Sequence, residues 1–324
     1  MLTIYTPQSA PSACSDQQIP YAPPLTTQFE EAYIERSINF TGPSLSILAL
    51  PNCTLPTSAR SYPPSPRCPK PSRTLLFSPG FAASRHLYSN ILSSIASSSN
   101  SLIISIDHPY DTDIIEYPSH LALPPTYGLP YLMNPDNTVN LTFIGATLSA
   151  RVEDLKSVTA NLPTLLTSTG LWTPSCVKQN VNNRRIGTFG HSLGGATSLS
   201  TLASPDSSSF VAGSDIDGSF WAAENTTNSQ LTTKKPFLLV AAEDHGKDNS
   251  WNEIWPQLEG EKEWIVVNKT THLSFTDGPV IMDLLKAEEK IGKAVKEAFV
   301  GAISGKELVK TMNRVYGTFF GRWV

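Results

Sequence analysis

The stretch IGTFGHSLGGATSL, residues 186–199, decides how this chain folds. A short apolar run leads into Gly-x-Ser-x-Gly, and small and apolar residues follow it. Strand, sharp turn and helix in this order are the setting of a nucleophile elbow. Such a turn strains the backbone of Ser192, and glycines are needed at 190 and 194 because strand and helix crowd each other there. The stretch therefore predicts a serine hydroxyl held out at the carboxyl end of a sheet strand.

The five-residue pattern by itself is common, and a structural serine in a glycine-rich turn explains it as well. Its flanking strand and helix favour the nucleophile. A serine hydroxyl is a poor nucleophile unless a base removes its proton. The rest of the chain must therefore supply a base, an acid and two donors for an oxyanion.

Short apolar runs on either side of the elbow predict a parallel sheet. Residues 74–78 (TLLFS) and 102–106 (LIISI) are expected to be buried strands joined by a helix over 84–97, which is the α/β signature. The remaining expected elements are a long helix over 146–166, strands over 211–217, 237–242 and 263–267, and helices over 250–258, 282–299 and 305–320. One domain over 1–324, with a mostly parallel central sheet and helices on both faces, is the simplest architecture.

Three segments lack this regularity. Residues 1–27 are rich in Pro, Ser, Thr and Gln and predict an irregular N-terminal arm. Residues 29–38 and 44–50 are expected to pair as antiparallel strands at a sheet edge, followed by a proline-rich loop. Residues 107–140 have no clear period, and a segment of that length usually forms a lid or substrate loop.

Composition excludes several classes of function. The 324 residues carry a net charge of −4 and only 16% charged residues, so no basic field is available to hold nucleic acid. There is no run of 18 apolar residues, so we expect no transmembrane segment. The four cysteines form no CxxC pair and none adjoins a histidine, so neither a metal nor another cofactor is expected. Composition leaves the oligomeric state open.

Cysteines and glycosylation sequons point to an oxidising compartment. Four cysteines permit two disulfides, and Cys53 and Cys68, which bracket the proline-rich loop, are the first expected pair. Asn-x-Ser/Thr sequons occur at Asn39, Asn52, Asn140, Asn225 and Asn268. Together with the low charge, these features favour a secreted glycoprotein over a cytosolic one. The first residues have no basic start and no long apolar stretch, so we expect the signal peptide to be absent from this sequence.

The base is found by elimination. On folds with this elbow, the catalytic residues follow the order Ser, then Asp or Glu, then His, and only His245 and His272 follow Ser192. His272 lies just past the strand over 263–267, where the base is expected. His245 lies where this fold more often provides an acid. We therefore expect His272 to be the base and interpret His191 as a packing or supporting residue.

The acid and the oxyanion donors come from strand ends. Asp217 and Asp244 each end a predicted strand, and position alone leaves both open. One oxyanion donor should be the backbone N–H of Leu193, directly after the nucleophile. The other should lie in the loop after an early strand, where Phe81 follows Pro79 and Gly80.

Several stretches together carry a family resemblance. They are LLFSPGFAASRHLYSNIL (75–92), IISIDHPYDTDIIEYP (103–118), RVEDLKSVTANLP (151–163), IGTFGHSLGGATSLSTL (186–202), SDIDGSFW (214–221), SWNEIWPQL (250–258) and THLSFTD (271–277). In this order and spacing the chain resembles the platelet-activating-factor acetylhydrolase-like family of α/β-hydrolases, in particular its secreted fungal members. The match to a polyester- and cutin-cleaving branch is weaker.

The resemblance implies the α/β-hydrolase fold and metal-free hydrolysis of carboxylic esters, often with a short acyl group. Carried over by motif, it implies Ser192 as the nucleophile, His272 as the base, and Asp217 rather than Asp244 as the acid. The chain has Pro79 where family members often have histidine. The proline removes one backbone N–H, but the donor at Phe81 is retained.

The leading hypothesis is a serine esterase that acts through an acyl-enzyme on a small-molecule or lipid-like ester with a short acyl group. One alternative is an acyltransferase or a cyclase of natural-product biosynthesis on the same fold. Another is a hydrolase-fold binding protein without catalysis. Tyr110 and Trp221 are expected to line the substrate site in each enzymatic case.

Overall fold

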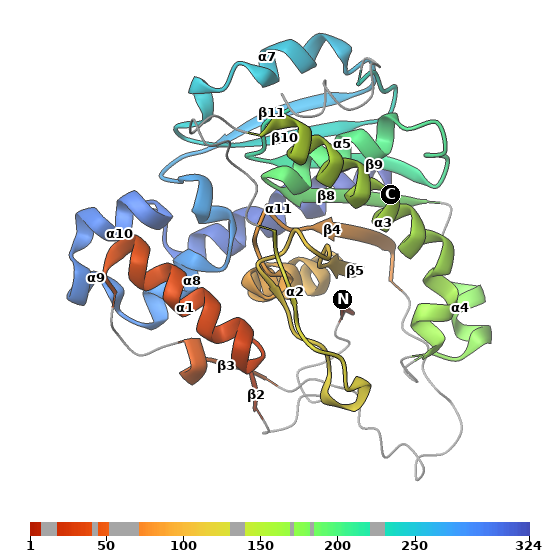
Figure 1. Cartoon of the computed structure of the whole chain (residues 1–324). Coiled ribbons are helices and arrows are strands. Elements are labelled where there is room, and N and C mark those ends of the chain that lie inside the picture. Colours follow the sequence, from red (N-terminus) through yellow and green to blue (C-terminus); the bar gives the residue numbers. More distant parts are fainter. Residues whose placement is uncertain are drawn as a thin grey trace.

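The structure is a computed structural model that describes residues 1–7, 18–40, 45–51, 71–129, 140–168, 172–181, 185–220 and 231–324. A seven-stranded sheet lies at its centre, in the order β1-β5-β4-β8-β9-β10-β11 (Figure 1). The strands in that order are Leu2–Tyr5, Ser101–Ile106, Arg73–Ser78, Ile186–His191, Phe210–Ile216, Phe237–Ala242 and Lys262–Val267. β1 pairs antiparallel to β5, and every following neighbour pair is parallel. The predicted mostly parallel sheet is therefore confirmed.

Helices cover both faces of this sheet, as predicted. Alternate residues of a strand point to opposite faces, so Leu76 packs on one side while Leu75 and Phe77 pack on the other. The first side is covered by α3 (Leu141–Ser168), α4 (Pro174–Asn180), α5 (Leu193–Ala203) and α7 (Ser250–Ile254). The second is covered by α2 (Ser89–Ser98) and α11 (Gly305–Trp323). Each face thus buries its own apolar cluster, which fixes the sheet from both sides.

The N-terminal segment differs from the prediction. The expected strand over 29–38 is part of helix α1 (Pro24–Ile38), which begins with a proline at its first position and buries Thr26, Thr27 and Glu30. That burial follows helical spacing rather than the alternation of a strand. The sheet edge is formed instead by β1, inside the segment expected to be irregular, and β2 (Gln18–Pro20) pairs with β3 (Ala49–Pro51).

A third apolar cluster lies beside the sheet. There α1 packs near α8 (Gly278–Leu284), α9 (Ala287–Ile291) and α10 (Lys293–Val300), as Figure 1 shows. We expected one helix over 282–299. It is broken because Lys286 and Gly292 adopt left-handed backbone conformations, with φ of 51° and 81°. These short helices pack together against the turn His272–Phe275, which precedes them in the chain.

The segment expected as a lid or substrate loop carries a short antiparallel ladder. β6 (Ile114–Ile115) pairs with β7 (Thr126–Tyr127), and the ring of Tyr127 lies 5.7 Å from that of Phe29 on α1. Residues 130–139 lie outside the described part of the chain. The lid function stays a prediction.

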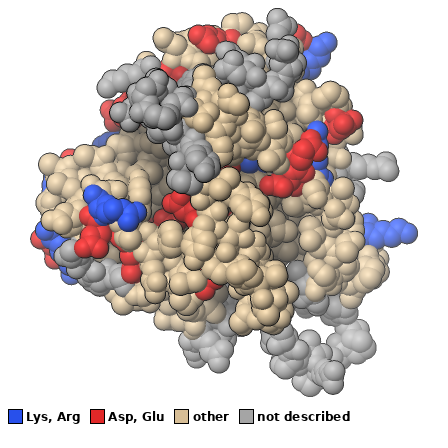
Figure 2. Space-filling model, in the orientation of Figure 1, with Lys and Arg blue, Asp and Glu red and all other residues tan. Residues whose placement is uncertain are grey.

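The structure can also be compared with the expectations about surface charge, disulfides and membrane-spanning helices. On the face shown in Figure 2, the charged side chains are scattered, and Lys and Arg do not gather into a basic patch. Cys176 is disulfide-bonded, while Cys53 and Cys68, the expected pair, lie outside the described residues together with Cys14. In the described part of the chain no helix is long and apolar enough to cross a membrane.

The backbone is closely packed where β4 and β8 meet α5. A Cβ atom on Gly194 would lie 1.9 Å from the carbonyl oxygen of Ser78, and one on Gly190 would lie 2.3 Å from the backbone of Gly194. Neither backbone segment has room for a side chain. The two glycines of the elbow are therefore required by this close approach, as the sequence predicted.

We predict that Gly194→Ala lowers the free energy of unfolding by about 3 kcal/mol, because the added methyl group forces two backbone segments apart. Gly317→Ala on α11 is the matched control, since its Cβ would meet nothing closer than 3.8 Å. That change should raise the free energy of unfolding by about 0.5–1 kcal/mol, because alanine is the better helix former. Equilibrium urea unfolding measures both, and equal stabilities would contradict the crowding argument.

Candidate active site

Ser192 occupies the turn between β8 and α5. Its backbone has φ 56° and ψ −125°, a strained conformation for a residue other than glycine. The strain is held by two backbone hydrogen bonds: the Ser192 N–H donates to the carbonyl of Ile216 at 2.8 Å, and its own carbonyl accepts from Gly195 at 2.9 Å. The predicted strand–turn–helix geometry around the serine is confirmed.

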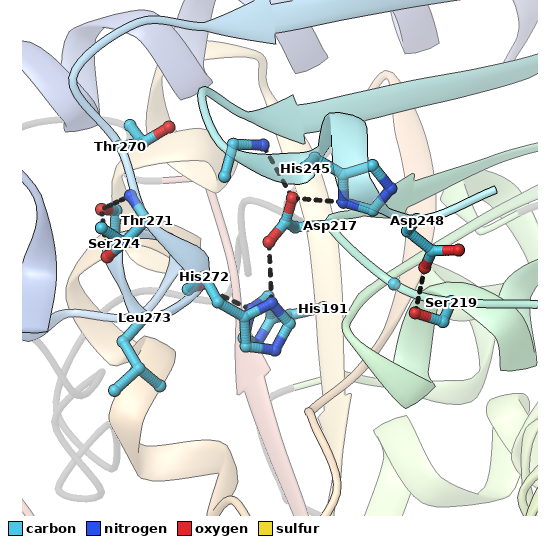
Figure 3. A network of polar contacts seen from close by, with 12 residues as sticks. His191, Asp217, Ser219, His245, Asp248, Thr270, Thr271, His272, Leu273 and Ser274 are labelled. Carbon is cyan, nitrogen blue, oxygen red and sulfur yellow. Dashed lines mark hydrogen bonds and ion pairs between the residues drawn. The ribbon is translucent and has the colours of Figure 1, made fainter. Parts of the chain in front are cut away.

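Asp217 follows β9 at the neighbouring strand end and carries a buried carboxylate with three donors. Oδ2 accepts from Nδ1 of His272 at 2.7 Å (Figure 3). Oδ1 accepts from Nδ1 of His245 at 2.8 Å and from the backbone N–H of Ala242 at 2.7 Å. Burial alone would raise the pKa of this carboxyl, but the hydrogen bonds from both imidazoles and from the amide outweigh it and hold the pKa below its usual range. Asp217 is therefore a carboxylate.

His272 begins the turn His272–Phe275 after β11, and its side chain is 47% exposed. Because Nδ1 donates to Asp217, the other ring nitrogen is left as the proton acceptor. No hydrogen bond joins that nitrogen to the Ser192 hydroxyl within the described residues. Catalytic hydrogen bonds are often long without substrate and shorten when it binds. The ring of His191, adjacent to Ser192 in the chain, lies 4.5 Å from the ring of His272.

His191 links the loops on both sides of the serine. Its Nε2–H donates to the carbonyl of His272 at 3.0 Å, so Nδ1 is the acceptor and takes the hydroxyl hydrogen of Tyr88 at 2.8 Å. The Tyr88 oxygen in turn accepts from the Gly80 N–H at 3.1 Å. Burial, with a smaller effect of the neighbouring His272, lowers the pKa of His191 to about 3. His191 is thus neutral and fits the supporting role expected from sequence.

Two backbone donors near the serine are unused. In the part of the chain that the structure describes, the N–H groups of Phe81 and Leu193 have no hydrogen-bond acceptor. Leu193 is the first residue of α5, where the helix dipole favours negative charge. A Cβ on Gly80 would lie 3.5 Å from Cβ of Ser192, so the loop that carries Phe81 lies directly beside the serine. Both are the donors predicted for an oxyanion.

Arg151 fixes that loop, and the sequence analysis missed it. Its guanidinium is buried and donates to the carbonyls of Pro79 at 2.6 Å and Gly80 at 3.0 Å. It also makes a two-point ion pair with buried Asp111. Arg151 lies on the same face of α3 as Leu148 and Leu155, and a charged residue within an apolar helical stripe is the signal that could have revealed it.

The other residues expected in the site have different outcomes in the structure. Asp217, not Asp244, contacts His272, so the geometry favours the first of the two acids left open by position. Tyr110 is 61% exposed with φ 67°, and its role in substrate binding stays a prediction. Trp221 lies outside the described residues. His245 was expected where an acid more often lies, and it is bonded to the acid instead.

An open cavity of about 670 Å³ adjoins His272. Its walls carry an excess of acidic side chains: Asp217, Asp244, Asp248 and Glu253. Asp248 is bonded to Ser219 and to the backbone of Ser250 and so holds one wall in place. A neutral or cationic group suits this cavity better than an anion. Among the described residues, no cluster of three or more His, Cys, Asp or Glu side chains is suited to a metal.

Comparison with known proteins shows which sequences and folds this chain is similar to. The family profile described as "Platelet-activating factor acetylhydrolase, isoform II" matches residues 161–319, which include Ser192, Asp217 and His272. The chain is therefore similar in sequence to platelet-activating factor acetylhydrolases. A "Probable 1-alkyl-2-acetylglycerophosphocholine esterase" of Arthroderma benhamiae is 32% identical over 254 residues, which make up 76% of this chain. The acetylhydrolase resemblance expected from the sequence is thereby confirmed.

Two further facts show how far the similarity extends. The matched part of the chain spans 59% of the length of the Arthroderma protein. A ferulic acid esterase from Streptomyces cinnamoneus has the same fold, with a TM-score of 0.61 and 21% identity over 100% of this chain and 82% of that one. The chain therefore has the α/β-hydrolase fold that the resemblance implied.

We predict that Arg151→Met lowers the free energy of unfolding by about 3–5 kcal/mol, because it leaves the Asp111 carboxylate buried without its partner. Combining it with Asp111→Leu should restore part of that loss, since both buried charges are then gone while the carbonyls of Pro79 and Gly80 still lack the donor. Lys156→Met is the control on the same helix: Lys156 pairs with the exposed side chain of Glu153, and its loss should cost under about 0.5 kcal/mol. Equal instability of the single and double variants in urea unfolding would contradict this account.

Proposed function

We propose that this protein is a serine carboxylic-ester hydrolase that works through an acyl-enzyme on Ser192. The observation that carries the proposal is the pair formed by buried, ionised Asp217 and half-exposed His272, 2.7 Å apart, at the same sheet edge as the serine elbow. An acid, a base and a nucleophile with these roles recur on unrelated folds that cleave esters and amides. The acetylhydrolase relatives support the same chemistry.

In the proposed mechanism, Nε2 of His272 takes the proton of Ser192 as its hydroxyl oxygen attacks the ester carbonyl. Asp217 keeps the proton of His272 on Nδ1 and stabilises the imidazolium that forms. His272 then gives its proton to the departing alcohol. Water attacks the acyl-enzyme with His272 as base again, which releases the acid and restores the serine.

The negative charge that develops on the carbonyl oxygen has two donors in this proposal. They are the free N–H groups of Phe81 and Leu193, held in place before substrate arrives. Phe81 is positioned by the loop that Arg151 and Tyr88 fix through the backbone of Gly80. Leu193 is positioned by the elbow. Preorganised donors stabilise the oxyanion without further rearrangement of the loop.

For the substrate we propose an ester with a short acyl group and a neutral or cationic alcohol part. The name of the Arthroderma relative describes an ester with an acetyl group, and the resemblance found in the sequence implies the same class. The acidic cavity beside His272 disfavours an anionic alcohol part there.

We also propose that the protein is secreted. Cys176 is disulfide-bonded, and disulfides persist mainly in oxidising compartments. Asn268, one of the five sequon residues, is exposed at the end of β11 and accessible for glycosylation.

Replacing Ser192 by Ala should leave the fold intact and lower kcat for p-nitrophenyl acetate by about 10⁴-fold or more, because the nucleophile is lost. The variant should also no longer react with a fluorophosphonate probe. Ser198→Ala on the same helix is the control: its hydroxyl bonds to the carbonyl of Thr188, so turnover should stay close to that of the unmodified protein. Unchanged hydrolysis by the Ser192 variant would refute the proposed nucleophile.

Acetate esters of equal size and different charge test the acidic cavity. We predict a higher kcat/KM for acetylcholine and 3,3-dimethylbutyl acetate than for 3-acetoxypropanesulfonate, with the anionic ester gaining several-fold when salt screens the carboxylates. Asp244→Asn with Glu253→Gln should raise kcat/KM for the anionic ester selectively. Glu288→Gln with Glu289→Gln on α9 removes the same charge outside the cavity. If both double variants change the rates alike, the cavity does not select by charge.

A further inference from the structure

Asp217 carries two imidazoles, one on each carboxylate oxygen, although the proposed mechanism uses only one. His245 begins the short turn His245–Lys247 soon after β10 and contacts Oδ1 of Asp217, whereas His272 contacts Oδ2 (Figure 3). Its side chain is 6% exposed, against 47% for His272. The two histidines therefore share a partner but not an environment.

We infer that His245 is a positioning residue of the hydrolase: it holds one oxygen of Asp217 so that the other is presented to His272. This inference deepens the proposed function and rests on it. His245 Nδ1 and the Ala242 N–H both donate to Oδ1, and both come from the end of β10. Two donors on one oxygen stop the carboxylate from rotating, so Oδ2 keeps a fixed direction toward His272.

The His245 ring is itself held in place by packing against Trp251. Its centroid lies 3.9 Å from that of Trp251, a fully buried residue of α7. The Trp251 indole N–H donates to the carbonyl of Gly218, the residue after Asp217. The ring, the indole and the Asp-Gly segment thus form a closed unit in which the position of His245 sets the position of the carboxylate.

His245 cannot replace His272 as the base. Its Nε2 is buried and has no hydrogen-bond partner in the part of the chain that the structure describes. A base must reach the proton that it removes, and only the half-exposed imidazole of His272 can do so. The effect of His245 on catalysis therefore passes through Asp217.

The charged and titratable groups around His245 set the direction of its effect. They are Asp217, which it contacts, Asp248, which interacts with it electrostatically, and His272 across the shared carboxylate. Asp244 and Glu253 line the same cavity. The hydrogen bond from His245 draws part of the negative charge of Asp217 toward Oδ1 and so away from His272. Its removal leaves more of that charge to favour the protonated imidazole of His272, so the acidic limb of the kcat/KM profile should move to higher pH.

Two substitutions separate the hydrogen bond from the packing. His245→Leu keeps much of the bulk and removes the donor. His245→Asn places an amide N–H where Nδ1–H was and removes the ring. We expect the leucine variant to lose about 10–100-fold in kcat with little change in KM, and the acidic limb of its kcat/KM profile to move to higher pH. The asparagine variant should stay within about threefold of the unmodified enzyme.

Three results would overturn the inference in this assay. The first is a folded leucine variant with unchanged kcat and pH profile. The second is an equal loss in both variants, which would mean that ring packing on Trp251 matters and the hydrogen bond does not. The third is a change in KM alone. Urea unfolding of each variant checks that it is folded under the assay conditions.

Proton NMR tests the same contact without activity. Imidazole N–H groups donated to a carboxylate give low-field resonances, and the described residues hold three: His245 and His272 on Asp217, and His108 on Asp154 at 2.8 Å. His245→Leu should remove its own signal, shift that of His272 and leave that of His108 unchanged. An unshifted His272 signal would overturn the inference. An inactive protein with the expected shift would instead refute the proposed esterase function and leave the coupling intact.

Discussion

The site depends on a backbone contact that only glycine permits. The start of α5 passes so close to the end of β4 that a methyl group on Gly194 would lie 1.9 Å from the Ser78 carbonyl. This approach forces the turn between β8 and α5 to be sharp, and the strain concentrates in Ser192, with φ 56°. The same approach brings the loop after β4 beside the serine, so one steric constraint brings the proposed nucleophile and the proposed oxyanion donors together.

Buried polar contacts then hold loops that the sheet alone does not fix. The loop after β4 is tied through its carbonyls to Arg151 and through the Gly80 N–H to Tyr88. The turn after β11 is tied through the His272 carbonyl to His191 and, further along, through Asp277 to the first turn of α2. Each anchor lies in the interior, where a hydrogen bond that is broken has no water to replace it. The site is therefore rigid where the chain is irregular.

The sequence predicted the features that follow from local pattern. The elbow and the buried strands depend on short runs whose chemistry is visible in one dimension, whereas position alone left Asp217 and Asp244 both open as the acid. The strand expected over 29–38 is wrong, because the spaced apolar residues there carry weak periodicity; Pro24 at the first helical position is the signal for the helix. Arg151 and His245 were missed for another reason. Their roles depend on partners, Asp111 and Asp217, that lie 40 and 28 residues away in the chain.

Four histidines at this sheet edge differ in solvent exposure, and that difference limits what each imidazole can do. His108, His191 and His245 are buried, and each uses a ring nitrogen to hold another group in place. Burial lowers the pKa of His191 to about 3, so this imidazole cannot store a proton during turnover. His272 alone among these four has an exposed ring, and the carboxylate behind it favours the imidazolium that forms when it takes a proton. In the proposed mechanism, a fold that presents four similar rings at one sheet edge leaves the proton transfer to the one ring that it exposes.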